Sequence, residues 1–399
     1  MKTILIVIRS EGDFERAISI GITAKNKYNT EFIFTGDFSP FFEDGIHNTF
    51  QKKLCIKNKF EIKDFSDYSF IGRLLKKLSG NKRLSFNDVR KNPANFIKYF
   101  FFTIFSKFIK RREYSILNKI FSSVQPDFVL TDQSNTDKEY LPEKIRQKAI
   151  EKGIKVYIYT HGAAGGLHSE FSNPVFKEYK NCTVFACSTN ETDPNFTNRI
   201  ILGDISSSYP YVHYLNEQSF DEIEFGSDKK YRIAFLIGGV MQAFTSTNGW
   251  SIQEEIIINL SEREDVAMIL KLHPREAKFM DLRMLNKFKN LKIVNNETDR
   301  SRITKWANIF VCNDHTSVIF EPMILGKKVV AIEGIHVPKY KNHHSPLKNS
   351  SLKFITNASE FSLENIPNAN PIDDVTNQIA WGGNGNIDLT ELMLKKLKS

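Results

Sequence analysis

Two short polar clusters in the C-terminal half of the chain combine residue types that bind phosphate. The first is Lys271-Leu272-His273-Pro274, directly after the apolar run Val266–Leu270. The second, Asn313–Lys328, follows the apolar run Ile309–Cys312 about forty residues later. Apolar runs of this length are typical of buried parallel strands, and open α/β sheets hold their ligands at the carboxyl ends of such strands. We therefore predict that both clusters lie at a ligand-binding edge of a sheet.

Two hydroxyl groups stand near the start of the second cluster. Thr316 and Ser317 are placed where a helix is expected to begin. The apolar residues that follow at helical spacing are Val318, Ile319, Met323 and Leu325. A helix amino terminus offers free N–H groups, here with two hydroxyls, so it favours an anion such as phosphate. The alternative is that Thr316 or Ser317 only caps the helix.

The composition is that of a folded protein with an anionic partner. The chain has 399 residues, enough for two domains, with 41% hydrophobic and 25% charged residues. A net charge of +9 and an isoelectric point near 9.1 favour binding to a nucleotide, a lipid surface or a nucleic acid. The sequence has no zinc-finger spacing, RNA-binding aromatic signature or arginine-rich tail, so we expect no nucleic-acid partner.

Neither the cysteines nor the apolar segments indicate export or insertion into a membrane. The four cysteines are scattered without metal-ligand spacing, which fits a reducing cytoplasm, and we predict that Cys312 is buried in a strand. The apolar run Thr3–Ile8 is too short for a signal peptide and is predicted to be the first strand. No segment approaches the ~20 apolar residues of a membrane span.

The first half of the chain alternates predicted strands and helices. Repeated βα units with continuous apolar strands predict a parallel sheet covered on both faces. The predicted strands are Thr3–Ile8, Glu31–Thr35, Asp127–Asp132, Lys155–Thr160, Thr183–Cys187 and Arg199–Leu202. The predicted helices Asp13–Ala24 and Pro142–Lys152 lie on either side of a long, basic and Phe-rich middle.

The second half repeats this order after the polar stretch 206–229, which lacks a clean period and which we interpret as a linker. Its predicted strands are Tyr231–Ile237, Val266–Leu272, Lys292–Val294, Ile309–Cys312 and Lys328–Ile332, and its last helix is Asp388–Lys398. The predicted fold is α/β, with two doubly wound, Rossmann-like domains facing each other across a cleft.

Aromatic and basic residues are concentrated in the stretch Asn95–Leu117. It holds Phe96, Tyr99, Phe100, Phe101, Phe102, Phe105 and Phe108 and the cations Lys98, Lys107, Lys110, Arg111 and Arg112. Aromatic residues beside cations suit a helix that lies on the surface of an anionic lipid leaflet. The alternative is an ordinary core helix with a solvated basic edge.

The pair formed by His273-Pro274 and Thr316-Ser317 resembles the HP and S-S/T motifs of bacterial glycosyltransferases that use cytidine nucleotides. Those enzymes have the GT-B fold, which is built of two Rossmann-like domains. They include sialyl- and polysialyltransferases, capsule-type Kdo transferases and the related CDP-glycerol glycerophosphotransferases. The resemblance covers mainly residues 233–335 and implies that the second domain binds a nucleotide-activated donor.

The resemblance implies roles for residues of both clusters. His273, followed by Pro274, looks like the ligand of the donor phosphate. Thr316 and Ser317 look like further phosphate or cytidine contacts. Glu321, one turn along the same predicted helix, is a candidate for the ribose hydroxyls, and the alternative is a solvated acid on the helix surface.

Other residues near the predicted donor site offer charge or close backbone approach. Lys271 adds positive field beside the imidazole, or is only a solvated charge at a strand end. Gly238 and Gly239 follow the first strand of the second domain, where they let backbone approach the donor or only form a tight turn. The second domain has no obvious Asp-X-Asp metal signature. We expect no metal ion and no cofactor besides the cytidine-nucleotide sugar that serves as donor.

The best candidate for a catalytic base is His161 in the first domain. It follows a predicted buried strand and precedes a turn that contains Gly162, Gly165 and Gly166. An imidazole there takes the proton from an acceptor hydroxyl during direct displacement. The CDP-glycerol and Kdo transferases have a similar His-Gly at the end of a first-domain strand. The alternative is that His161 only shapes the glycine turn.

Two pairs of acids in the first domain are further candidates. Glu43 and Asp44 precede Gly45 and resemble the acid-acid-Gly motif of the sialyltransferases, which makes them the rival base, although the motif stands early in the chain for that family. Glu11 and Asp13 follow the first strand, and we expect them to face the same edge of the cleft and bind acceptor.

These features predict an inverting, metal-independent glycosyltransferase of bacterial surface polysaccharide, lipopolysaccharide or capsule synthesis. We expect a CMP-activated sugar, Kdo or another nonulosonic acid, as donor and a glycan or lipid-linked glycan as acceptor. We assign 1–215 to an acceptor-binding domain, 230–375 to a donor-binding domain and 376–399 to a C-terminal tail helix. We expect a cytoplasmic protein, peripherally associated with the inner face of a bacterial membrane through Tyr99–Arg112.

Three alternatives stay open. One is a polyol-phosphate transferase that uses CDP-glycerol, for which Asp314, two residues before Thr316, is a partial match. Another is a sugar-nucleotide epimerase of the same two-domain architecture, which normally needs more acids in the cleft. The third is a non-catalytic glycan- or nucleotide-binding protein, for which a full two-domain cleft would be surplus.

Overall fold

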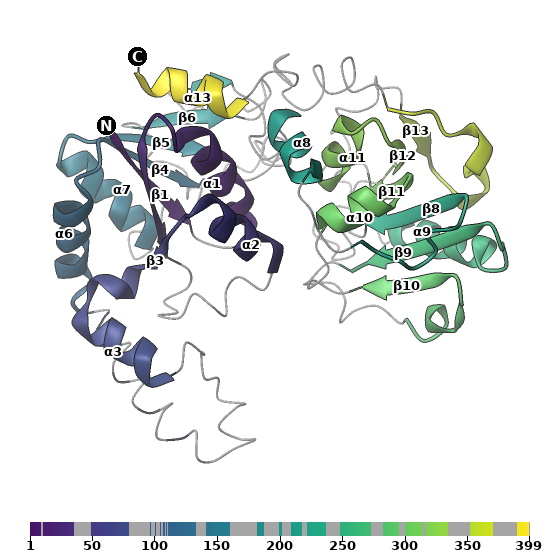
Figure 1. Ribbon diagram of the computed structural model, residues 1–399, viewed down its shortest axis with the longest axis horizontal. Coiled ribbons are helices and arrows are strands. Elements are labelled where there is room, and N and C mark those ends of the chain that lie inside the picture. The colour runs from purple at the N-terminus through teal and green to yellow at the C-terminus, as the bar shows by residue number, and fades with distance from the viewer. Residues whose placement is uncertain are drawn as a thin grey trace.

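The chain forms two parallel β-sheets with helices on both faces, as the computed structural model shows (Figure 1). The first sheet has seven strands, β1 (Thr3–Ile8), β2 (Asn29–Phe34), β3 (Ile62–Asp64), β4 (Phe128–Asp132), β5 (Lys155–Tyr159), β6 (Thr183–Ala186) and β7 (Arg199–Ile201). The second has six, β8 (Tyr231–Leu236), β9 (Val266–Lys271), β10 (Leu291–Val294), β11 (Ile309–Asn313), β12 (Lys328–Ile332) and β13 (Lys353–Ile355). The predicted α/β architecture of two doubly wound domains is confirmed.

The helices that surround these sheets differ in length and kind. The α-helices are α1 (Glu11–Ala24), α2 (Thr49–Asn58), α3 (Phe70–Ser79), α6 (Glu113–Val124), α7 (Leu141–Glu151), α8 (Tyr209–Glu217), α9 (Asn248–Leu260), α10 (Arg300–Trp306), α11 (Phe320–Ile324) and α13 (Leu389–Lys398). The 3₁₀ turns are η3 (Phe65–Tyr68), η9 (Leu285–Lys287), η10 (Ser317–Ile319), η12 (Ala358–Glu360) and η13 (Leu363–Asn365). The structure describes residues 1–8, 11–35, 49–79, 96, 100, 104, 107, 109, 111–132, 141–159, 182–186, 199–201, 209–217, 222–236, 248–272, 282–294, 300–313, 317–333, 352–369 and 389–398.

The central strand β1 of the first sheet buries alternate residues on opposite faces. On β1, Ile4, Ile6 and Ile8 pack into the core that includes α1, α2 and α13. Leu5 and Val7 point to the other face, where they meet α6 and α7. Because both faces are covered, the strands are continuously apolar, as the sequence predicts for a parallel sheet.

The second sheet is built in the same way. On β11, Phe310 and Cys312 pack against α10 and α11, and Cys312 is fully buried as predicted. Ile309 and Val311 face the opposite core, which contains α9 and the 3₁₀ turns that follow β13. The described residues therefore form four apolar cores, one on each face of the two sheets.

The stretch 206–229 is not only a linker, because it contains α8. Val212 is buried in the core of the second sheet, and Leu215 is buried in the core of the first. The hydroxyl of Tyr214 accepts a hydrogen bond of 3.1 Å from Asn58 Nδ2 on α2. Val212 and Leu215 are three positions apart on α8, so one short helix contacts both halves of the chain.

The C-terminal helix α13 returns to the first sheet and lies beside α1 (Figure 1). Its side chains Met393, Leu394 and Leu397 are buried in the first core. The hydroxyl of Tyr28 donates a hydrogen bond of 3.4 Å to the carbonyl oxygen of Leu394. The end of the chain is therefore part of the N-terminal half of the molecule.

The predicted strands and the structure agree to within two residues at each end. Two short strands were not predicted, β3 and β13, which have three residues each and lie at the outer edges of their sheets. Ile62 and Lys63 are only half-buried, and so are Lys353 and Phe354. Edge strands with this exposure lack the continuous apolar run that marks a central parallel strand.

We predict that Leu394→Ala destabilises the protein by roughly 2–5 kcal/mol, because it leaves a cavity in the first core. Glu391→Ala on the same helix is the control, since it removes an exposed ion pair of 2.8 Å with Lys27 and should cost less than about 1 kcal/mol. Urea unfolding of both variants measures the difference. Equal losses would show that α13 adds little to the core.

Candidate functional site

In both sheets the strand order reverses at one point. The first sheet runs β3-β2-β1-β4-β5-β6-β7 and the second β10-β9-β8-β11-β12-β13. In the first sheet, β1 connects to β2 on one side, whereas β4 connects to β5 on the other side. In the second sheet, β8 and β11 likewise connect to β9 and β12 on opposite sides. Open α/β sheets bind ligands outside the carboxyl ends of the strands at such a point.

The register of the second sheet brings parts of both polar clusters to this edge. Lys271, the last residue of β9, pairs with Leu236, the last residue of β8. Leu236 also pairs with Cys312 on β11, so Asn313 comes directly after it at the same edge. The half-buried Lys271 thus lies one strand away from the reversal point, and Asn313 lies at it.

A buried pair of amides occupies the reversal point. Gln253 on α9 is fully buried, and its Nε2 donates a hydrogen bond of 3.3 Å to Oδ1 of Asn313, which is itself buried. The Oε1 atom of Gln253 is buried and has no hydrogen-bond partner among the described residues. A buried acceptor without a donor costs about 1–3 kcal/mol, so this atom suits a ligand that brings an N–H or O–H group.

Sequence reasoning missed Gln253, although the sequence holds a signal for it. Its neighbours Ile252, Ile256 and Ile257 are buried and give α9 its apolar face. A Gln between them is a polar side chain at a core position. Asn313 was part of the second cluster but had no predicted role.

The second cluster does not begin with a long helix. Ser317 starts the 3₁₀ turn η10, and only Phe320–Ile324 form the α-helix α11. Pro322 has no N–H group, and Gly326, with φ +66°, stops the helix after one and a half turns. So short a helix has only a small dipole, and the predicted anion site at its amino terminus stays a prediction.

Glu321 is buried, so the alternative that it is a solvated acid on the helix surface is wrong. It lies on α11, which packs against β12 and α8. Its predicted contact with the ribose stays a prediction.

The remaining donor and catalytic candidates lie outside the described residues. They are His161, Glu43, Asp44, His273, Pro274, Thr316, Gly238 and Gly239. The side chains of Ser317, Glu11 and Asp13 also lie outside the described part of the chain, although their backbone positions are described. Their predicted roles stay predictions.

The first sheet nevertheless places the backbone of Glu11 and Asp13 near one edge. Glu11 and Asp13 lie in the first turn of α1, just after the carboxyl end of β1. Tyr159 ends β5, two residues before His161, and pairs with Asp132 at the end of β4. Because β4 lies between β1 and β5, α1 begins at the reversal point of the sheet, and β5 ends one strand away from it.

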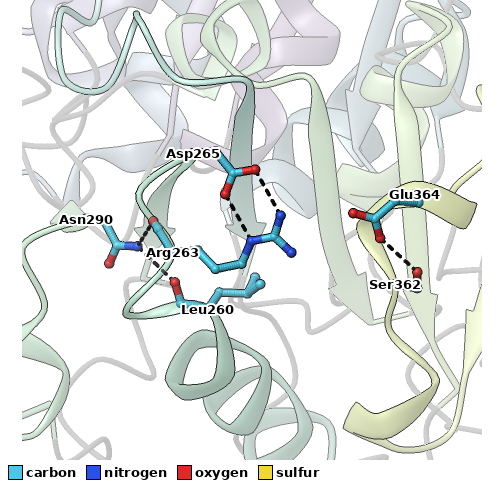
Figure 2. Close-up of polar contacts among 6 residues, drawn as sticks. All are labelled: Leu260, Arg263, Asp265, Asn290, Ser362 and Glu364. Atoms are coloured by element: carbon cyan, nitrogen blue, oxygen red, sulfur yellow. Dashed lines mark hydrogen bonds and ion pairs between the residues drawn. The ribbon is translucent and has the colours of Figure 1, made fainter.

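The opposite, amino edge of the second sheet is closed by local polar contacts (Figure 2). The guanidinium of Arg263 donates two hydrogen bonds, of 3.0 and 2.9 Å, to Asp265, which lowers the pKa of the carboxyl and raises that of the guanidinium. Asn290 Nδ2 donates to the carbonyl oxygens of Leu260 and Arg263 at 2.9 and 3.3 Å. These contacts fix the turn between α9 and β9, so we assign this edge a structural role.

Two buried cysteines are poorly suited to act as nucleophiles. Burial raises the pKa of the Cys55 thiol to about 12 and that of Cys182 to about 11. Both thiols are therefore protonated at neutral pH, and the thiolate is the reactive form. Among the described residues, no group of three or more His, Cys, Asp or Glu side chains could hold a metal ion.

Comparison with known proteins identifies the architecture. No protein-family model matches the sequence, and no curated protein sequence matches it either. A solved structure described as a UDP-N-acetylglucosamine 2-epimerase from Listeria monocytogenes aligns with 100% of this chain and 96% of its own, with a TM-score of 0.60 and 10% identity. The fold is GT-B.

Two further solved structures share the GT-B fold with this chain. The MnaA protein of S. aureus in complex with UDP aligns with a TM-score of 0.57 and 12% identity, covering 100% of this chain and 96% of its own. A glycosyltransferase from Rickettsia africae aligns with a TM-score of 0.53 and 14% identity, covering 100% and 98%. Identities this low establish the GT-B fold alone.

We predict that Gln253→Leu weakens nucleotide binding as well as lowering stability. The variant deprives buried Asn313 of a donor, which should cost about 1–3 kcal/mol of unfolding free energy. Gln147→Leu is the matched control, because Gln147 also donates an amide hydrogen bond, 2.9 Å to Glu143 Oε1, but lies on α7 of the first sheet. Calorimetric titration with nucleotide decides between them, and equal affinities in the two variants would remove Gln253 from the site.

Proposed function

We propose that the protein is a glycosyltransferase that transfers a sugar from a nucleotide-activated donor to a glycan acceptor. One observation carries the proposal: in a GT-B fold, the reversal point of the second sheet holds a buried amide pair in which Gln253 Oε1 has no partner among the described residues, and Lys271 ends β9 at the same edge. That oxygen suits an N–H or O–H group of a base or sugar, and the Lys271 cation favours phosphate.

The donor that we propose is a CMP-activated sugar acid, Kdo or another nonulosonic acid. This step rests on the resemblance of His273-Pro274 and Thr316-Ser317 to cytidine-nucleotide transferases. His273 and the two hydroxyls would stabilise the negative charge that develops on the departing phosphate. The acceptor would be a glycan of bacterial surface polysaccharide.

In the proposed reaction the acceptor oxygen bonds to the anomeric carbon as the bond from that carbon to the phosphate oxygen breaks. The electron pair of the broken bond stays on the departing nucleotide phosphate. The proton of the acceptor hydroxyl passes to the His161 imidazole, for which Glu43 or Asp44 is the rival. A single displacement of this kind inverts the anomeric centre.

Nucleotide preference tests the donor assignment. We expect CMP to raise the thermal midpoint more than UDP or GDP, and we expect His273→Ala to weaken CMP binding by roughly tenfold or more, since a charge-assisted contact is worth about 1.5–3 kcal/mol. Lys292→Ala is the control, because Lys292 is exposed on the neighbouring strand β10. A preference for UDP or GDP would overturn the cytidine assignment.

The pH dependence of transfer tests the base. His161 must be neutral to accept a proton, so kcat/KM should rise with pH through the ordinary imidazole pKa of ~6.5. His161→Ala should abolish transfer and leave donor affinity unchanged. A flat profile between about pH 5.5 and 8, or an active His161→Ala variant, would move the role of base to Glu43 or Asp44.

A second candidate function is epimerisation of a UDP-sugar. The TM-scores favour it. The structure described as an epimerase has a TM-score of 0.60 and the UDP complex of MnaA has 0.57, whereas the glycosyltransferase from Rickettsia africae has 0.53. Incubation with UDP-N-acetylglucosamine, followed by NMR of the sugar, separates the two functions. Formation of the C2 epimer without an acceptor would replace the proposed transfer.

A further inference from the structure

The excess of positive over negative charge is concentrated in one part of the chain. Residues 70–112 carry twelve Lys or Arg residues and one Asp. All other residues together carry 43 Lys or Arg and 45 Asp or Glu, which is close to neutral. The net charge of +9 therefore comes entirely from this segment.

The same segment exposes large apolar side chains. Six of the ten large hydrophobic residues that are exposed in the described part of the chain lie between residues 70 and 114. Phe96, Phe100 and Ile104 are helical and are 58%, 52% and 46% exposed. The rings of Phe96 and Phe100 stack with centroids 6.4 Å apart and an angle of 19° between planes. A core helix would bury these side chains, so that alternative is wrong at these three positions.

The spacing of these residues places them on one helix face. Positions four residues apart lie above one another on a helix, so Phe96, Phe100 and Ile104 form a stripe. Lys107 and Arg111 are helical and exposed, and their spacing continues the same stripe toward α6. The face is thus apolar at one end and cationic at the other, and we name it the Phe96–Arg111 face.

The helix α3 repeats this combination. Phe70 is 72% exposed, Leu74 is also exposed, and both lie on one side of the helix with the exposed Arg73 next to them. Both α3 and α6 pack against η3, so the two helices start from the same place in the first domain. Figure 1 shows α3 extending from this domain on the side away from α13.

We propose that the Phe96–Arg111 face and α3 form a docking surface for an anionic lipid bilayer. Aromatic and aliphatic side chains enter the boundary between headgroups and acyl chains, and Lys and Arg remain at the anionic headgroups. Nucleic acid would satisfy the cations but gives exposed Leu74 and Ile104 nothing to bury against. No helix in the described part of the chain is long and apolar enough to cross a membrane, so docking is peripheral.

The docking surface lies on the first domain, to which we assign acceptor binding. It would hold the protein where a lipid-linked acceptor is presented, while the donor arrives from solution. The inference goes beyond the proposed function, because lipid binding needs neither donor nor acceptor and is measured without them.

Sedimentation of the full-length protein with vesicles tests the surface. We expect the protein to pellet with vesicles of phosphatidylcholine and phosphatidylglycerol at low salt, and to stay in solution with phosphatidylcholine alone. Each cation near an anionic surface strengthens partition by roughly fivefold, so Lys107→Glu with Arg111→Glu should weaken it by tenfold or more. Phe96→Ser with Phe100→Ser should weaken it at both low and high salt, because it removes inserted apolar area.

Matched controls separate the docking surface from general charge and exposed apolar area. Lys289→Glu with Lys292→Glu reverses two exposed cations of the second domain, and Ile258→Ser removes an exposed side chain of α9. Both controls should pellet as the wild type does, and all variants should bind nucleotide equally, which shows that they fold. Wild-type protein that stays in solution with anionic vesicles, binds RNA in preference to them, or pellets regardless of the face variants would overturn the proposal.

Discussion

Burial of both faces of each parallel sheet is the constraint on which the rest of this structure depends. A strand such as β11 that is covered on both sides has no position along its length where a polar side chain can meet water. Polar residues are therefore confined to the strand ends, and the reversal of strand order brings the ends of β8 and β11 together. The apolar pattern of the strands thus determines where the candidate site lies. The polar residues directly after the strands determine its chemistry.

Contacts from outside each sheet couple the two halves of the chain. The helix α11, which follows β11 and η10, packs against α8, and α8 places Leu215 in the first core. The helix α13 then returns from the far end of the sequence to α1. Both connections are apolar, so the halves are held together by buried contacts as well as by the chain. An enzyme that must bring donor and acceptor to reacting distance needs such positioning.

The sequence predicted central strands well because their apolar runs are long and uninterrupted. It did not predict β3 and β13, whose half-buried edge positions carry Lys63 and Lys353. It interpreted the region of α8 as a linker because only Val212 and Leu215 are buried there in a polar stretch. The sequence placed Lys271 at the end of a strand, and the register of β8 and β9 confirms that place. Gln253 could not be found this way, because it lies within a helix and becomes part of the edge only through Asn313.

The distribution of charge along the chain decides which anionic partner the net charge indicates. Taken over the whole chain, +9 favours any anionic partner, including a nucleotide. Residues 230–375, to which we assign donor binding, hold 19 Lys or Arg and 16 Asp or Glu, so the overall charge of the second domain is only weakly positive. If a nucleotide binds at the carboxyl edge of the second sheet, as we propose, individual groups such as Lys271 would add to this weak attraction. The basic segment instead adjoins exposed aromatic side chains on the first domain, and that combination is one that a lipid surface satisfies and a soluble nucleotide does not.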